Sequence, residues 1–128
     1  MPQGGIDEGE DPLAAAQREL YEETNVRAAT LLAEAPEWLA YDLPEEALSR
    51  FGGRYRGQTQ KWFLFRFEGE DAEIDIHHPA GGAHKPEFAD WRWERFEALP
   101  DLVVPFKRDI YVRVAALFAP VARAQRPA

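Results

Sequence analysis

The stretch that decides the fold runs from residue 4 to residue 26 and reads GGIDEGEDPLAAAQRELYEETNV. Its glycine-rich start predicts a turn, and the residues that follow predict a helix from Pro12 to about Thr24. Asp11 is the expected N-cap, because Asp side chains accept hydrogen bonds from the first free backbone N–H groups of a helix. Proline is favoured at the next position, where its missing N–H group removes no helical hydrogen bond. We therefore expect the chain to be organised around this turn and helix.

Three glutamates, Glu19, Glu22 and Glu23, fall on one side of this helix at 100° per residue. Like charges three or four residues apart destabilise a helix by about 0.2–0.5 kcal/mol per pair, so the cluster calls for a cation. Carboxylate oxygens suit Mg²⁺ or Mn²⁺ better than zinc. The alternative for the helix taken alone is a solvated acidic surface.

The spacing over residues 4–26 resembles the Nudix box. Gly4 is followed at fixed intervals by Glu10, by REL at residues 18–20, by EE at 22–23 and by NV at 25–26. Asn25 is the one departure, since the family usually has glycine there. We expect a positive φ at this position, which asparagine tolerates next best, and therefore little harm. The resemblance implies a hydrolase that cleaves a nucleoside diphosphate from another group with metal-bound glutamates.

Four further stretches, at residues 2–5, 60–63, 87–93 and 103–108, resemble the bacterial branch of RNA pyrophosphohydrolases and dinucleoside polyphosphate hydrolases. This resemblance implies Mg²⁺-dependent removal of pyrophosphate from the 5′ end of triphosphorylated RNA. Hydrolysis of diadenosine tetraphosphate is the alternative reaction. A non-catalytic nucleotide or RNA sensor is the alternative from another functional class.

The same resemblance implies the residues of the site. It assigns Mg²⁺, or Mn²⁺ in its place, with more than one ion, to the carboxylates of Glu19, Glu22, Glu23 and Glu87 and to a backbone carbonyl of Gly4 or Gly5. Glu19 and Glu87 are the two candidates for the general base, and the sequence does not separate them. Arg18 is expected to anchor the motif by pairing with Glu10 rather than to touch substrate.

A basic stretch follows the acidic one and is a candidate to meet phosphates. Residues 50–66 contain four arginines and Lys61 but no acidic residue. Lys61 and Arg56 are the candidate phosphate or RNA contacts, with an ordinary solvated surface as the alternative. Tyr41 and Phe106 are candidates to stack on bases, which is worth about 1–3 kcal/mol per base, with core packing as the alternative.

Composition limits the remaining possibilities. The chain has 128 residues, 45% hydrophobic residues, four Trp and no Cys, which predicts a single domain over 1–128 with a frayed tail at 125–128 and excludes a disulfide or zinc-thiolate site. The net charge of −8 argues against broad nucleic-acid binding. We expect a cytoplasmic protein whose partners are 5′-phosphorylated RNA or a dinucleoside polyphosphate, and neither DNA nor a membrane. The oligomeric state is left open.

The fold class implied by the resemblance is α/β, a Nudix-type α/β/α sandwich with a mixed sheet. The family places strands before the box, and here the box begins at Gly4, almost at the first residue. We therefore expect an N-terminally truncated domain that lacks those strands. Hydrophobic patterns predict the other elements: strands within residues 27–44 and at 58–67, 72–76 and 88–95, a helical turn at 44–51 and a packing helix over 104–124. The 58–67 strand should be buried on both faces, and Trp91 and Trp93 should lie in the core.

Overall fold

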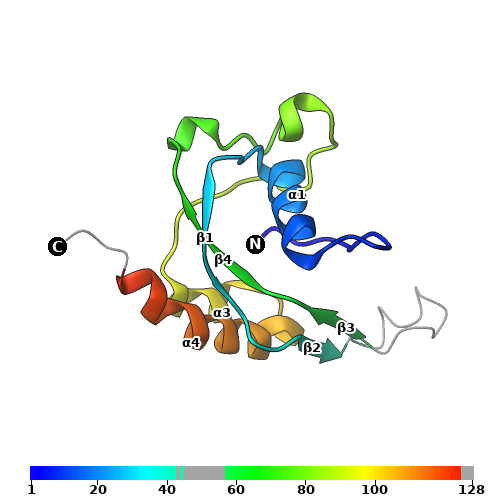
Figure 1. Cartoon of the computed structure of the whole chain (residues 1–128). Coiled ribbons are helices and arrows are strands. Elements are labelled where there is room, and N and C mark those ends of the chain that lie inside the picture. The colour runs from blue at the N-terminus through cyan, green and yellow to red at the C-terminus, as the bar shows by residue number, and fades with distance from the viewer. Residues whose placement is uncertain (43, 45–56, 125–128) are drawn as a thin grey trace. The chain divides into compact units, whose positions relative to one another are not determined.

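A computed structural model describes residues 1–42, 44 and 57–124 (Figure 1). It has mixed helices and strands, as the sequence predicts, and separates into two compact units. Unit 1 comprises Met1–Leu32 and Phe65–Trp93, and unit 2 comprises Ala33–Leu64 and Glu94–Ala128. The helical turn predicted at 44–51 and the tail at 125–128 lie outside the described residues, apart from residue 44. No helix in the described part of the chain is both long and apolar enough to cross a membrane.

Unit 1 contains helix α1, Pro12–Thr24, with the boundaries predicted from the sequence (Figure 1). The Asp11 carboxylate accepts hydrogen bonds from the backbone N–H groups of Leu13 and Ala14 at 3.1 and 3.2 Å. At the other end, Asn25 is left-handed with φ 68°, and its N–H donates to the Tyr21 carbonyl. Asparagine thus takes the conformation for which glycine is favoured after a helix.

The chain after strand β4, Phe63–Phe67, differs from prediction, because residues 72–76 do not form a strand. A 3-10 turn, η1, covers Asp71–Glu73, and a second, η2, covers Pro79–Gly82. The Asp75 N–H donates to the Thr24 carbonyl, while the Asp75 carboxylate accepts from the N–H groups of His77 and His78. Backbone groups of this segment therefore have local or helix-end partners instead of a neighbouring strand.

The strand predicted over 88–95 is also absent from this described segment, and its tryptophans are not core residues. Trp91 and Trp93 are 36% and 61% exposed. The Trp93 ring stacks on Phe67 with centroids 6.0 Å apart, and its indole N–H donates to Asp71. The alternating aromatic and charged residues therefore lie in a surface segment without strand structure rather than in a half-buried strand.

The single strand predicted over 58–67 is two strands. Strand β3, Gly57–Gln60, pairs antiparallel with β2, Leu39–Asp42, and strand β4, Phe63–Phe67, neighbours β1, Ala29–Glu34 (Figure 1). The chain changes partner at Trp62, whose carbonyl accepts from the Ala35 N–H at 2.9 Å. Because β4 is only partly buried and each sheet has two strands among the residues that the structure describes, the expected central strand buried on both faces is not formed there.

Unit 2 is built around helix α4, Arg108–Ala124, which is preceded by the turns η3, Phe96–Ala98, and η4, Pro105–Lys107, and by the short helix α3, Leu99–Leu102. The predicted packing helix is thus confirmed, beginning four residues later. Its buried side chains join residues in and next to the preceding strands in one core: Ala35, Leu39, Trp62, Ile110, Tyr111, Val114 and Phe118. Leu117, which lies three residues after the buried Val114 on the helix, is 39% exposed.

Candidate metal and catalytic site

Arg18 is the centre of the charged face of α1. Its Nε and Nη2 atoms donate to the two carboxylate oxygens of Glu10 at 2.8 and 2.9 Å, which forms the pair expected from the sequence. Its Nη1 atom donates to Glu19 at 2.8 Å and to Glu22 at 2.9 Å. A further bond from Nη2 reaches the Gly5 carbonyl at 2.8 Å. One guanidinium therefore fixes the glycine turn and two of the predicted metal ligands.

These contacts shift the titration of both members of the Arg18–Glu10 pair. The hydrogen bond from Arg18 lowers the pKa of Glu10 to about 2, helped by the backbone N–H of Asp7. The same hydrogen bond raises the pKa of Arg18 above its usual value. Charge-assisted bonds of this bidentate kind are among the stronger ones in proteins. Both members of the pair are consequently charged at neutral pH.

Glu23 lies on the buried side of the same cluster and is 8% exposed. Burial, together with the charges of Glu19 and Glu87, raises the pKa of Glu23 to about 7, against the lowering effect of the Gln3 N–H bond. That bond, from the Gln3 N–H to the Glu23 carboxylate, is 2.9 Å long. The effect of Glu87 on this pKa places its charge near Glu23, although Glu87 itself is exposed.

The glycine turn packs directly on the carboxylate of Glu19. A Cβ atom added at Gly4 would overlap the Glu19 carboxylate, whereas one added at Gly5 would meet nothing within 4 Å. Gly4 therefore allows the backbone to approach the Glu19 carboxylate closely, and Gly5 contributes the carbonyl that Arg18 binds. Of the two glycines, only Gly4 lies where an added side chain would meet the Glu19 carboxylate.

The donor set suits a hard divalent cation, because it consists of carboxylate and carbonyl oxygens and includes the buried Glu23. The carboxylates of the described residues are not gathered around one point. Among the described residues, no group of three or more His, Asp or Glu side chains is arranged to hold a metal ion. In this arrangement Arg18 engages Glu19 and Glu22, while Gln3 engages Glu23.

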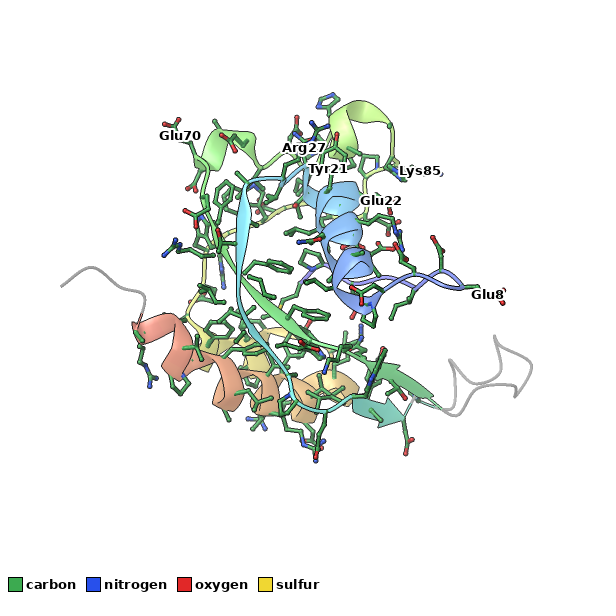
Figure 2. All side chains as sticks on the ribbon, in the orientation of Figure 1. Glu8, Tyr21, Glu22, Arg27, Glu70 and Lys85 are labelled. Atoms are coloured by element: carbon green, nitrogen blue, oxygen red, sulfur yellow. The ribbon has the colours of Figure 1, made fainter. Side chains whose placement is uncertain are left out.

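His84 is a neighbour of the site that sequence reasoning did not find. Its Nε2 atom lies 3.4 Å from the Glu22 carboxylate, which projects from the C-terminal half of α1 (Figure 2). The Asn25 side chain also accepts a bond from the Gly81 N–H at 2.9 Å. These contacts bring the loop after β4 to the end of α1. No local spacing signals them, because His77, His78 and His84 match no helical zinc motif.

The predicted substrate contacts that the structure describes belong to unit 2. The Tyr41 and Phe106 rings lie 5.7 Å apart with a 41° tilt, and the Lys107 ammonium is 5.6 Å from the Tyr41 centroid. Burial raises the pKa of Tyr41. Lys61 donates to the Ala35 carbonyl and pairs with Glu34 at 3.1 Å, and its side chain is only 12% exposed. Arg56 lies outside the described residues.

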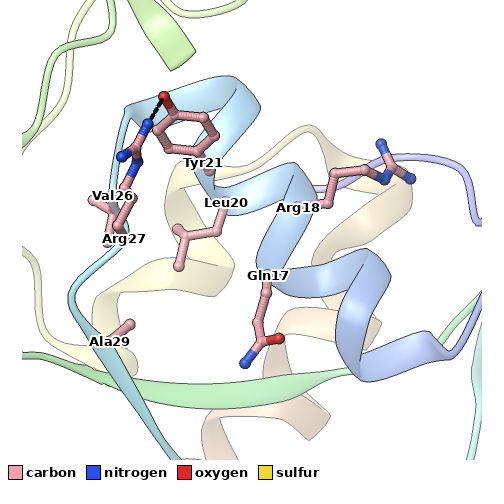
Figure 3. Close-up of a pocket in the computed structure, with 7 residues that line it drawn as sticks. All are labelled: Gln17, Arg18, Leu20, Tyr21, Val26, Arg27 and Ala29. Carbon is pink, nitrogen blue, oxygen red and sulfur yellow. Dashed lines mark hydrogen bonds between the residues drawn. The ribbon is translucent and has the colours of Figure 1, made fainter. Parts of the chain in front are cut away.

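A pocket of about 350 Å³ lies on the other side of α1 from the Arg18 guanidinium (Figure 3). It is lined by Gln17, Arg18, Leu20, Tyr21, Val26, Arg27 and Ala29. The Arg27 guanidinium lies 4.4 Å from the Tyr21 ring centroid and donates to the Tyr21 hydroxyl. None of the predicted ligands or bases lines this pocket, so the acidic face and the pocket are separate features of unit 1.

The chain is similar to known proteins over most of its length. A family model of the NUDIX domain matches residues 1–114. The RNA pyrophosphohydrolase of Bradyrhizobium sp. (strain ORS 278) is 59% identical over 123 residues, covering 95% of this chain and 73% of that protein. The RNA pyrophosphohydrolase of Rhizobium meliloti (strain 1021) is 56% identical over 124 residues, covering 96% and 74%. The chain therefore belongs to the Nudix hydrolase family.

Proposed function

We propose that this chain is a Mg²⁺-dependent RNA pyrophosphohydrolase that removes pyrophosphate from the 5′ end of triphosphorylated RNA. The observation that carries the proposal is the identity of 56–59%, over most of this chain, to relatives named RNA pyrophosphohydrolase. The acidic face of α1 supplies a chemistry suited to that reaction. One water adds to the attacked phosphorus, the phosphoanhydride bond breaks, and the products are 5′-monophosphorylated RNA and pyrophosphate.

The proposed ligands are the carboxylates of Glu19, Glu22, Glu23 and Glu87 with a carbonyl of Gly4 or Gly5. When bound, Mg²⁺, or Mn²⁺ in its place and in more than one copy, would neutralise the phosphates and lower the pKa of a coordinated water. The protein's own part is to accept the proton of the attacking water, for which Glu19 and Glu87 are the two candidates. Arg18 and Glu10 hold the turn and helix together rather than contact substrate.

On the substrate side, we propose Tyr41 and Phe106 as stacking partners for a base, with Lys61 and Arg56 as phosphate contacts. The tilted Tyr41–Phe106 pair and the Lys107 ammonium beside it support a surface that could receive an aromatic ring next to a negative charge. The ion pair of Lys61 with Glu34 means that a phosphate would have to compete with that carboxylate. The α/β/α sandwich with a mixed sheet and a cytoplasmic location remain predictions.

The test is turnover of triphosphorylated RNA by the wild-type chain and by Glu19→Gln in the presence of Mg²⁺. Glutamine keeps the size of the side chain but removes the charge, so turnover should fall at least about 100-fold. Glu8→Gln is the matched control, since Glu8 is an exposed glutamate of the preceding turn (Figure 2). It should retain wild-type turnover.

Three outcomes would contradict the proposal in different ways. Unchanged turnover by Glu19→Gln would show that the acidic face is not catalytic. Faster hydrolysis of diadenosine tetraphosphate than of triphosphorylated RNA by the wild-type chain would keep the reaction class and change the substrate. Binding of either substrate without turnover would identify a sensor instead of an enzyme.

A further inference from the structure

The Arg18 guanidinium has two edges with different partners. One edge, Nε and Nη2, is bound bidentately by Glu10. The remaining nitrogen, Nη1, bridges Glu19 and Glu22 across one turn of α1. The Arg18 side chain is 28% exposed, and the side chains of Glu10, Glu19 and Glu22 are 16–23% exposed. The interactions are therefore partly shielded from water, which strengthens them compared with fully exposed pairs.

The oxygens that Nη1 occupies are atoms that a divalent cation would need. Mg²⁺ takes oxygen ligands at about 2.0–2.1 Å in near-octahedral geometry and tolerates little distortion. Oε1 of Glu19 and Oε2 of Glu22 each lie within 2.9 Å of Nη1. A cation joining both carboxylates would meet the positive guanidinium and would compete with it for these oxygens.

We propose that Arg18 is the internal counter-cation of the acidic face and that a divalent cation must displace its Nη1 atom from Glu19 and Glu22. Glu10 retains the other edge, so the arginine stays tethered while the two glutamates are released. The inference rests on the proposed function, in which these glutamates bind the metal. Arg18 is then a positioning residue that sets metal affinity as well as holding the glycine turn through the Gly5 carbonyl.

Glu10 and Arg18 should consequently affect metal binding in opposite directions. Removing the guanidinium eliminates the competitor and leaves Glu19 and Glu22 free for the metal. Removing the Glu10 charge eliminates the tether, so Arg18 can engage Glu19 and Glu22 more fully. The effect of Glu10 on metal affinity must also depend on Arg18, because it acts through that side chain.

The experiment is a Mn²⁺ titration of the full chain, with free Mn²⁺ measured by electron paramagnetic resonance at low ionic strength, where such pairs are least screened. Arg18→Gln should bind Mn²⁺ about five- to tenfold more tightly than wild type, as expected for the loss of partly shielded ion pairs. Arg27→Gln is the matched control for loss of one positive charge in unit 1, because Arg27 contacts Tyr21 and not the acidic face. It should bind Mn²⁺ with wild-type affinity.

Glu10→Gln provides a second test that does not require Arg18→Gln to fold. It should weaken Mn²⁺ binding severalfold, and in the Arg18→Gln background the same change should have no effect. The inference would be overturned if Arg18→Gln bound Mn²⁺ no more tightly than wild type, or if Glu10→Gln bound Mn²⁺ as tightly as wild type. In either case, Mn²⁺ binding by the wild-type chain would leave the proposed metal site intact. Absence of Mn²⁺ binding by the wild-type chain would overturn the metal site itself and this inference with it.

Discussion

The acidic face of unit 1 and the core of unit 2 are stabilised by different kinds of interaction. The acidic face depends on one guanidinium and its charged hydrogen bonds to Glu10, Glu19 and Glu22. The core depends on burial of apolar side chains such as Val114 and Phe118, at 1% and 3% exposure. The first should therefore respond to pH, salt and cations, and the second to loss of side-chain volume.

The largest expected effect is on the core. Phe118→Ala should lower the free energy of unfolding by about 3–5 kcal/mol, because it removes a buried ring and leaves a cavity among Trp62, Tyr111 and their neighbours. Urea denaturation followed by tryptophan fluorescence would measure it. Trp62 lies in this core and reports on its packing.

Leu117→Ala is the matched control for this substitution. Leu117 precedes Phe118 on the same helix but is 39% exposed, so its truncation should cost less than about 1 kcal/mol. A similar loss for the two variants would mean that burial in α4 does not determine the stability of unit 2. If Phe118→Ala also altered Mn²⁺ affinity, the acidic face would not be independent of the core of unit 2.

The second prediction concerns Glu23 in the metal-free protein. The folded-state pKa of about 7 exceeds the ordinary value of 4.5, so the folded protein binds the extra proton between these values. Stability from this group is present below pH 4.5 and is lost as the pH rises to about 7. Glu23→Gln cannot titrate, so the fall in the free energy of unfolding over this pH range should be smaller by about 2 kcal/mol, a value discounted for screening by water. Urea unfolding at several pH values in a chelator would measure it.

Glu10 provides a control of opposite sign. Its pKa is lowered to about 2, so its contribution is present above pH 4.5 and is lost as the pH falls toward 2. Glu10→Gln should therefore change the pH dependence on the acidic side, where Glu23→Gln changes it near neutrality. Identical pH profiles for the two variants would contradict both assignments.

The parts of the molecule that sequence predicted well depend on local chemistry. Asp11 and Pro12 define the start of α1, and Asn25 its end, because each acts on backbone groups within four residues. The Arg18–Glu10 pair was likewise expected, since the motif keeps the two residues at a fixed separation on a turn and the helix that follows. Periodicity also located the apolar stripe of α4, although not the exposure of Leu117.

The parts that sequence missed depend on partners distant along the chain. Alternation around Trp91 and Trp93 suits a strand, but a strand also needs a neighbour to bond its backbone, and the hydrophobic pattern carries no information about that neighbour. The contact of His84 with Glu22 and the bond from Gln3 to Glu23 are also non-local. A continuous apolar run at 58–67 likewise cannot show that the chain changes partner strands at Trp62.

The smallest predicted effect tests whether unit 1 has a local contribution separate from its charged face. Asp11→Ala removes the acceptor for the N–H groups of Leu13 and Ala14 and should lower the free energy of unfolding by about 1 kcal/mol. Asp11→Asn keeps an oxygen acceptor and should stay near wild type, with both changes measured by urea denaturation. Because these two bonds of Asp11 involve neither Arg18 nor the glutamates that Arg18 binds, the Mn²⁺ affinity should not change. Equal destabilisation by alanine and asparagine would mean that the carboxylate charge, rather than the cap, stabilises the start of α1.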